Sequence, residues 1–313
     1  MAHSLSLPYY YSVHRLQIAS ELHLPELYPL VAEELQSVSF ETVDATIRFG
    51  DVPTKLEEPH SEGAFHQAKP NQFLLPVDGI ASYWVEAGKR ITIQPEPQAT
   101  EDEIRLFLLG SVLGALLHQR GQLILHGSAV QTPKGAVIFC GASGAGKSTL
   151  AAALQKRGYP VLADDVCAIK LDENGQPHVV PGVNRIKLWA DATKKLNQPV
   201  EGLKRVRPQV EKYSVPLSCN CPPDAAPLMM IYELNKGSTD EILCETVTRQ
   251  QKFSLLGRHT YRQEYMRGLG VQATHFQQVM RVGSRVAVQS ITRPQTPYRL
   301  DELVEMLERD FNK

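Results

Sequence analysis

The sequence lacks several features that would assign it to a specialised class of protein. Its 33 lysines and arginines nearly balance its 34 aspartates and glutamates, and the formal net charge of -1 argues against a general binder of nucleic acid or anionic membranes. The longest apolar run, residues 104–117, contains Arg105 and is shorter than the roughly 20 residues that cross a bilayer. The first segment, MAHSLSLPYYYSVHRLQ, has no basic head, apolar centre and small-residue cleavage site. We therefore expect a cytoplasmic protein with no membrane span and no nucleic-acid partner.

Cysteine is scarce and scattered. The five cysteines are odd in number, which fits reduced thiols better than a disulfide framework. Cys219 and Cys221 form a C-x-C pair, but no second Cys or His pair follows at zinc spacing. The sequence therefore predicts free thiols and no zinc site.

The chain is long enough for about two domains, because 313 residues with 42% apolar content can bury a substantial core. Residues 1–99 contain short strand-like segments at 9–18, 42–49, 72–77, 81–85 and 90–93, with a polar stretch at 51–71. Thr100 and Glu103 form a capping box for a helix that ends near Gly121. We predict an α/β (α+β) fold with a small β-rich amino-terminal domain (1–99), a connecting helix (100–121) and a P-loop catalytic domain (122–313).

A glycine-rich loop lies between an apolar strand, AVIFC, and a predicted helix at 148–156. It matches the pattern G-x-x-x-x-G-K-[ST], in which backbone N–H groups hold the phosphates of a nucleotide. Lys147 is expected to reach the β and γ phosphates, and the Ser148 hydroxyl to bind Mg²⁺. The predicted ATP-binding residues are Gly141, Ala142, Ser143, Gly144, Ala145, Gly146, Lys147, Ser148 and Thr149.

Other P-loop classes are disfavoured by what is missing. The L-S-G-G-Q string of transporter ATPases does not occur, and Asn235-Lys236-Gly237-Ser238 imitates the guanine-reading N-K-x-D without its Asp. No long basic face interleaved with aromatics suggests a nucleic-acid motor. Nor is there an arginine-dense lid of the nucleoside-kinase kind.

Two adjacent carboxylates follow the loop closely in sequence. Asp164 and Asp165 are predicted to end the short strand YPVLA, so they should emerge beside the phosphates. Because neighbouring strand residues point to opposite sides, we expect different roles, one holding Mg²⁺ and the other accepting a proton from an attacking hydroxyl. His126 lies on the preceding strand, where it either orients this base or is a satisfied core histidine.

The stretch 123–166 resembles the HPr serine kinase/phosphorylase family, whose catalytic domain is a P-loop fold similar to phosphoenolpyruvate carboxykinase. It contains, in order, LHGSAV, AVIFCGASGAGKST, a helix ending in KRGY, and VLADDV. The resemblance implies that Asp164 is the catalytic base, with His126 beside it, and that Asp165 binds the metal together with Ser148. Lys147 is the third predicted catalytic residue.

The chain departs from this family after the two aspartates. The family's E-x-R-G-L-G stretch, with its metal-binding glutamate, is replaced by PGVNRIKLWADA, which puts the reverse, phosphorolytic reaction in doubt. Arg185 and Lys187 in this segment become candidate phosphate or substrate contacts, although solvated strand residues are an equal alternative. The string Arg267-Gly268-Leu269-Gly270 lies about a hundred residues further on and is treated as a coincidence.

A narrower resemblance, carried by SELHLPEL, RIKLWADA and RHTYR, is to a divergent branch that includes lasso-peptide precursor kinases. Two basic clusters, 204–207 with Lys212 and 258–262, are either solvated faces or substrate contacts, with Arg258 and Arg262 as candidates for the latter.

These observations together predict a serine kinase that uses ATP and Mg²⁺. Its expected acceptor is a small protein or peptide, with a lasso precursor favoured and HPr an alternative, and the resemblance implies a homo-oligomer. A nucleotide-gated peptide-binding protein without transfer activity and a small-molecule kinase remain open alternatives.

Overall fold

The computed structural model describes residues 9–35, 42–207, 210–217 and 224–312. These residues form two compact units. Unit 1 contains residues 9–35, 42–122 and 262–275, and unit 2 contains residues 123–207, 210–217, 224–261 and 276–312. The predicted C-x-C pair of Cys219 and Cys221 lies outside the described residues, whereas Cys140, Cys167 and Cys244 are free thiols.

Unit 1 is built on a nine-stranded sheet with the order β3-β1-β2-β4-β9-β8-β7-β6-β5. Its pairings are antiparallel except for β2 with β4 and β4 with β9, which are parallel. The alternation of buried and less buried residues along β8 and β9 explains why these segments form strands with one core-facing side. The strands are β1 (Tyr9–Val13), β2 (Leu16–Ser20), β3 (Tyr28–Pro29), β4 (Ala45–Phe49), β5 (Ser61–Gly63), β6 (His66–Lys69), β7 (Gln72–Val77), β8 (Ala81–Glu86) and β9 (Arg90–Pro95).

Two details of this sheet differ from the sequence prediction. The segment 9–18, predicted as one strand, contains the turn of a hairpin, because His14 and Arg15 both have positive φ. The polar stretch 51–71 contains the short strands β5 and β6 instead of being entirely loop.

The helices of unit 1 begin with α1 (Ala32–Leu35). The predicted capping box is confirmed: Thr100 Oγ1 accepts from the Glu103 N–H at 3.3 Å, and Glu103 Oε2 accepts from the Thr100 N–H at 3.0 Å. The helix that follows runs as α2 (Glu101–Phe107), a buried π-helical segment (Leu108–Val112) and α3 (Leu113–Gln119). The Tyr83 hydroxyl donates to the Ile104 carbonyl at 3.0 Å, so this helix is fixed to β8. The division into 1–99, 100–121 and 122–313 stays a prediction.

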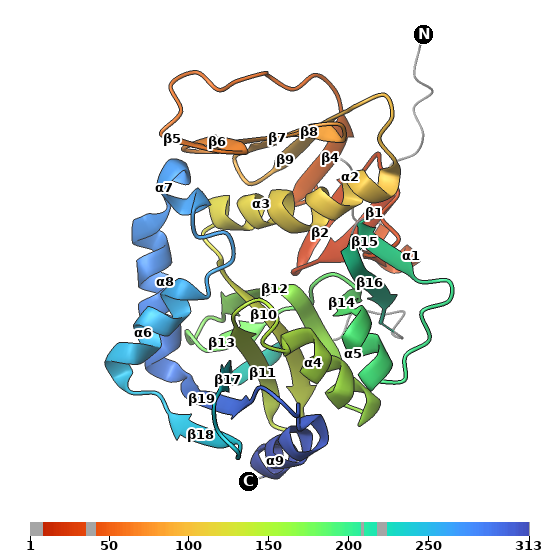
Figure 1. Cartoon of the computed structure of the whole chain (residues 1–313). Coiled ribbons are helices and arrows are strands. Elements are labelled where there is room, and N and C mark those ends of the chain that lie inside the picture. Colours follow the sequence, from red (N-terminus) through yellow and green to blue (C-terminus); the bar gives the residue numbers. More distant parts are fainter. Residues whose placement is uncertain (1–8, 36–41, 208–209, 218–223, 313) are drawn as a thin grey trace. The chain divides into compact units, whose positions relative to one another are not determined.

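A short segment from late in the chain completes unit 1. Helix α7 (Tyr265–Leu269) packs on β5 and β6 (Figure 1). The Tyr265 ring centroid lies 4.7 Å from that of His66 and 4.5 Å from that of Phe73, and a side chain at Gly268 would collide with Ala68. This close contact requires glycine at position 268.

Unit 2 contains a seven-stranded sheet with the order β11-β10-β12-β13-β17-β19-β18, in which β11 also pairs with β17 in parallel. A separate three-stranded sheet has the order β14-β16-β15. The strands are β10 (Leu123–Thr132), β11 (Gly135–Gly141), β12 (Val161–Leu171), β13 (Pro177–Val179), β14 (Arg185–Trp189), β15 (Lys204–Arg207), β16 (Val210–Pro216), β17 (Ala226–Gly237), β18 (Leu243–Thr246) and β19 (Ala287–Pro294). The helices are α4 (Lys147–Lys156), α5 (Ala190–Lys195), α6 (Arg249–Arg258), α8 (Gln272–Arg285) and α9 (Leu300–Asn312), and α8 belongs to this unit from Phe276 onward.

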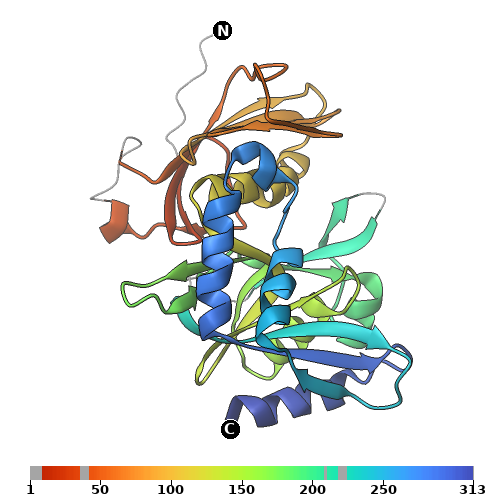
Figure 2. The same cartoon turned by 90° about the vertical axis from the view of Figure 1, so that its left-hand side faces the viewer.

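Helices cover both faces of the seven-stranded sheet. Apolar residues of α6 and α8 form one core with the first face, and Figures 1 and 2 show these two helices side by side. Residues of α4, α5 and α9 form a second core with the opposite face. On α9, the residues buried in this second core are Leu303, Val304, Leu307 and Phe311. The predicted mixed α/β fold class is confirmed.

The strand predicted to end at Asp164 and Asp165 instead continues as β12 to Leu171. The buried residues Cys167, Ala168 and Ile169 extend it, because they pair with the first half of β10. The paired aspartates therefore lie within a strand. Among the helices of the described residues, none combines the length and apolar character of a membrane span.

Candidate functional site

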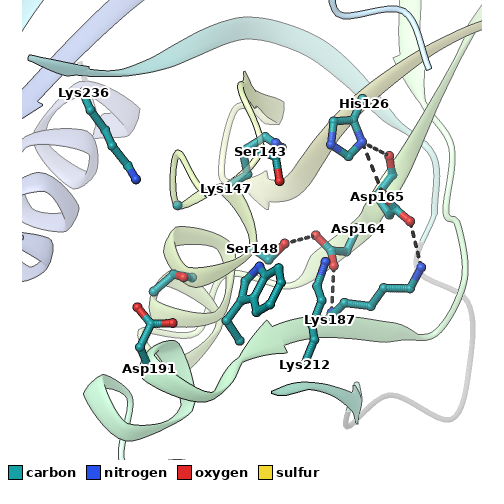
Figure 3. A pocket seen from close by; sticks show the side chains of 14 residues that line it. His126, Ser143, Lys147, Ser148, Asp164, Asp165, Lys187, Asp191, Lys212 and Lys236 are labelled. Atoms are coloured by element: carbon teal, nitrogen blue, oxygen red, sulfur yellow. Dashed lines mark hydrogen bonds and ion pairs between the residues drawn. The ribbon is translucent and has the colours of Figure 1, made fainter. Parts of the chain in front are cut away.

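A pocket of about 310 Å³ in unit 2 brings most of the sequence-predicted site residues together (Figure 3). Its lining combines the glycine-rich loop, the paired aspartates and the strand that carries His126. The lining residues are His126, Ser143, Gly144, Gly146, Lys147, Ser148, Thr149, Asp164, Asp165, Lys187, Trp189, Asp191, Lys212 and Lys236. Gly141, Ala142 and Ala145 belong to the same loop but lie outside this lining.

The loop has the backbone conformation that its glycines allow. Gly141 has φ +146° and Gly146 has φ +108°, and both values are strained for residues with a side chain. A Cβ at Gly141 would lie 2.5 Å from the Leu234 carbonyl oxygen, and one at Gly146 would lie 2.9 Å from the Tyr298 hydroxyl. Helix α4 begins directly after Gly146, so its first N–H groups and its partial positive charge point at the loop.

The Lys147 side chain is folded back over the loop. Its ammonium donates to the carbonyl oxygens of Gly141 at 2.8 Å and Ala142 at 3.2 Å. Burial lowers the pKa of Lys147, although the nearby Cys140, Asp164 and Asp165 act in the opposite direction. A cation held in this way is already placed for the terminal phosphates of a nucleotide.

Asp164 is joined to the loop through a serine hydroxyl. Its Oδ1 accepts from the Ser148 hydroxyl at 2.8 Å and from the Ser128 hydroxyl at 2.7 Å, and its Oδ2 accepts from the Lys187 N–H at 2.8 Å. Ser128 was not predicted from the sequence, although it lies two residues after His126 and therefore on the same face of β10. The Asp164 carboxylate is thus the one next to the predicted Mg²⁺-binding hydroxyl.

Asp165 lies in the same pocket because of its backbone conformation. Strand alternation predicts that neighbouring carboxylates point to opposite sides, yet both line one pocket. Asp165 has φ +75°, a left-handed value that Asp and Asn tolerate better than most residues. The prediction of opposite sides was therefore wrong, because the local twist at Asp165 changes the direction of its side chain.

Asp165 contacts Lys187 and His126. The Lys187 ammonium donates to Asp165 Oδ2 at 2.8 Å, and His126 Nδ1 lies 3.3 Å from Oδ1 and 3.2 Å from the Asp165 carbonyl oxygen. Burial alone would raise the pKa of Asp165, but the Lys187 charge and the hydrogen bonds from His126 and Lys187 hold that pKa well below its ordinary value. The Asp165 carboxylate is therefore ionised at neutral pH.

The main chain of His126 is fixed by a segment from later in the sequence. The His126 N–H donates to the His259 carbonyl oxygen at 2.7 Å, and the Tyr261 N–H donates to the Ile124 carbonyl oxygen at 2.9 Å. The His259 ring contacts Glu233 Oε1 at 2.7 Å, and Arg258 donates to the same oxygen. Hydrogen bonding from His259 and Arg258, against the effect of burial, lowers the pKa of Glu233 to about 2.

Three arginines predicted as candidate phosphate or substrate contacts lie outside the pocket lining. Arg185 is buried on β14. Arg258 contacts Glu233, with its Nη2 2.7 Å from Oε1. Arg262 belongs to unit 1, where it donates to the Ser111 hydroxyl at 3.0 Å. Of the four cations named as candidates, the pocket thus contains only Lys187.

Four lining residues were not assigned to the site from the sequence: Trp189, Asp191, Lys212 and Lys236. Partial indications existed, since Lys212 belongs to a predicted basic cluster and Lys236 to the imitation N-K-x-D string. Trp189 and Asp191 stand in RIKLWADA, the segment that supplied the candidates Arg185 and Lys187, but neither of them was named as a contact.

The donor set fits Mg²⁺ bound together with phosphates. Among the described residues no group of three or more His, Cys, Asp or Glu side chains could hold a metal by itself. The Ser148 hydroxyl and the Asp164 carboxylate offer hard oxygen ligands 2.8 Å apart. Mg²⁺ is typically held by one or two carboxylates plus substrate phosphates and water, so this set is sufficient only when a nucleotide is bound.

Comparison with known proteins finds similar chains among solved structures. No protein-family model matches the chain, and no curated protein matches it either. Among solved structures, the chain is similar to the Hpr(Ser) kinase/phosphatase from Coxiella burnetii, at 20% sequence identity over 60% of this chain and 90% of that chain, with a TM-score of 0.31. A similarity at this TM-score gives no information about function.

Proposed function

We propose that the protein is an ATP- and Mg²⁺-dependent kinase that transfers the γ-phosphate to a serine hydroxyl of a small protein or peptide. One observation carries the proposal: a phosphate-binding loop, a carboxylate bonded to its serine, and a second ionised carboxylate beside a histidine line one pocket. A protein that only binds a nucleotide would require the phosphate-binding loop and neither carboxylate arrangement. The second carboxylate supplies the proton acceptor that transfer to a hydroxyl requires.

The proposed reaction needs little covalent chemistry from the protein. The acceptor oxygen forms a bond to the γ phosphorus, the bond to the β–γ bridging oxygen breaks, and ADP leaves with that electron pair. The hydroxyl proton passes to a pocket carboxylate. Lys147 and the α4 amino terminus stabilise the negative charge on the phosphates, and bound Mg²⁺ would neutralise charge on the β and γ oxygens.

The contacts favour a division of roles opposite to the one implied by the family resemblance. Asp164 is bonded to Ser148, the predicted metal-binding hydroxyl, so we assign it to the metal side. Asp165 contacts His126 and is held ionised by Lys187, so we assign it as the proton acceptor. His126 then positions the Asp165 carboxylate.

The acceptor is proposed from the sequence resemblance alone. A lasso-peptide precursor is favoured and HPr is the other candidate, and a cytoplasmic homo-oligomer is part of the same proposal. The pocket contacts do not depend on this choice, because phosphoryl transfer places selectivity in the surfaces that hold the acceptor.

Transfer of label tests the proposal directly. The full chain is incubated with γ-labelled ATP, Mg²⁺ and either a serine-containing peptide or HPr, with the same acceptors carrying alanine in place of serine as matched controls. Label on the serine form only supports the kinase. Tight ATP binding without transfer to any acceptor would instead support a nucleotide-gated binding protein, and transfer to a free small hydroxyl compound alone would support a small-molecule kinase.

The pH dependence of transfer should change when Lys187 is replaced. Asp165 must be ionised to accept a proton, so activity is lost as the pH falls through its pKa. Lys187→Met removes the nearest positive charge and a hydrogen bond while the burial remains, so the pKa of Asp165 rises. The acid limb of the pH–rate profile is therefore expected to move to higher pH, because a neighbouring opposite charge that favoured the ionised carboxylate is gone.

Lys236→Met is the matched control for this measurement. Lys236 lines the same pocket but is not among the groups that shift the pKa of Asp165. Its variant should keep the acid limb of the wild type. An unchanged acid limb in Lys187→Met would show that Asp165 is not the group whose protonation stops transfer.

A further inference from the structure

An exposed tryptophan lines the part of the pocket beyond the carboxylates. Trp189 is 45% exposed although it belongs to a strand that packs on a core. On β14, Ile186 and Leu188 are buried against α4 and α5, so Lys187 and Trp189 share the opposite face, toward the pocket. Keeping a large aromatic surface in contact with water is unfavourable, and such residues are enriched where a partner covers them.

The position of Trp189 relative to the catalytic residues follows from the strand. Lys187 reaches Asp165, and Trp189 lies two residues further along β14, roughly 7 Å away. Asp191 follows in the first turn of α5. Figure 3 shows His126, Asp165 and Lys187 at one end of the pocket and Asp191 at the other, with Ser148 between them.

A positively charged residue, Lys212, lies near both Trp189 and Lys147. The Lys212 ammonium lies 5.6 Å from the centroid of the Trp189 ring. It is also close to Lys147: burial is the main cause that lowers the pKa of Lys147, and the charge of Lys212 lowers it further. The pocket thus contains carboxylates and His126, then phosphate-binding lysines, then an aromatic ring and a final carboxylate. The same order is expected for the bound reactants, with the acceptor hydroxyl at the carboxylates and His126, the polyphosphate at the lysines, and the nucleoside at the aromatic ring.

We propose that Trp189 and Asp191 form the nucleoside subsite of the pocket. The base stacks on the Trp189 indole, and the Asp191 carboxylate accepts a hydrogen bond from a ribose hydroxyl. Lys212 lies between this subsite and Lys147 and faces the phosphates next to the nucleoside. The inference rests on the proposed function, because it takes the loop to be occupied by a nucleoside triphosphate.

The chain offers a direct probe, because it has only two tryptophans. Trp84 belongs to unit 1, where it packs against Val52, Leu56 and Leu74, and its buried indole N–H has no hydrogen-bond partner among the residues that the structure describes. Trp84→Phe therefore keeps an aromatic ring in that cluster and leaves Trp189 as the sole source of tryptophan fluorescence. In this background ATP and inorganic triphosphate are titrated, with fluorescence and calorimetry recorded in parallel.

Both compounds should bind, and only ATP should quench Trp189. Trp189→Ala in the wild-type background is expected to weaken ATP about tenfold or more, as loss of one base stack does, while the affinity for triphosphate stays the same. Trp189→Phe should restore most of the ATP affinity. Wild-type protein should bind ATP more tightly than 2′,3′-dideoxy-ATP, and Asp191→Ala, which removes the acceptor oxygens, should lose that preference.

Two results would overturn the subsite. If ATP and triphosphate bind equally to the wild type and to Trp189→Ala, with no quenching, the loop is occupied but the base lies elsewhere, and the proposed function stands. If neither compound binds, the subsite fails together with the proposed function. The triphosphate titration therefore separates the two failures.

Discussion

The Asp165→Asn protein is expected to bind ATP with Mg²⁺ about as tightly as the wild type and to transfer phosphate roughly 10²- to 10⁴-fold more slowly, the usual contribution of a general base. The amide cannot accept the acceptor's proton. Asn tolerates the left-handed backbone at this position as well as Asp does, so the loop and Asp164 should keep their places. Calorimetry with MgATP gives the affinity, and labelled ATP with the serine acceptor gives the rate.

Asp164→Asn is the matched variant. It should also lose transfer. In addition, Mg²⁺ should no longer strengthen ATP binding, because the Asp164 carboxylate is one of the two hard oxygen ligands and the other is the Ser148 hydroxyl. Calorimetry with and without Mg²⁺ separates the two effects. If the loss of the Mg²⁺ effect is found in Asp165→Asn and not in Asp164→Asn, the roles implied by the family resemblance hold and our exchange of them is wrong.

Lys147→Met should reduce transfer by at least about 10²-fold, comparable with the loss of one fixed charge-stabilising donor in other active sites. Methionine keeps most of the length of the side chain and removes its charge. Since the ammonium is held at the loop by the Gly141 and Ala142 carbonyls, no other lysine of the pocket can take its place without reorganisation. ATP affinity should fall more than ADP affinity, because the charge serves the terminal phosphates.

The thermal midpoint of Lys147→Met serves as its control. The substitution destabilises the fold because the Gly141 and Ala142 carbonyls lose a hydrogen-bond donor. It also removes a charged group that is costly to bury, as the lowered pKa of Lys147 indicates. The two effects oppose each other, so we expect the thermal midpoint to change by only a few degrees. Near-normal turnover in a folded variant would contradict the assignment of Lys147. A large loss of stability would be checked with Lys147→Arg, which restores the charge and should recover part of the ATP preference.

Local sequence patterns were sufficient for the loop and its flanking elements. The glycines, Lys147 and Ser148 are contiguous, so their backbone geometry depends on a few neighbouring residues, and α4 begins within one residue of its predicted start. The capping box at Thr100 is local in the same sense. The sequence also predicted that Asp164 lies near this loop, because only a short helix and a short strand separate them.

The remainder of the site depends on contacts between distant segments. Trp189 and Lys212 come to the pocket through the pairing of β14 with β16, where these two residues are directly opposite, and nothing in either segment fixes that register alone. Opposite directions were predicted for Asp164 and Asp165 because strand alternation assumes a regular strand, whereas Asp165 has positive φ. The contact of Arg258 with Glu233 could not be predicted, because Glu233 lies on a strand 25 residues earlier.

The return of residues 262–275 to unit 1 has a consequence for how such a chain can change in evolution. Tyr261 is hydrogen-bonded to β10 in unit 2, whereas α7, a few residues later, covers His66 and Phe73 in unit 1. A recombination break near residue 122 would leave the Tyr265 ring without the aromatic partners against which it packs. Loss or exchange of the amino-terminal sheet therefore requires a second, coordinated deletion, so the two units should be inherited together instead of being shuffled as independent modules.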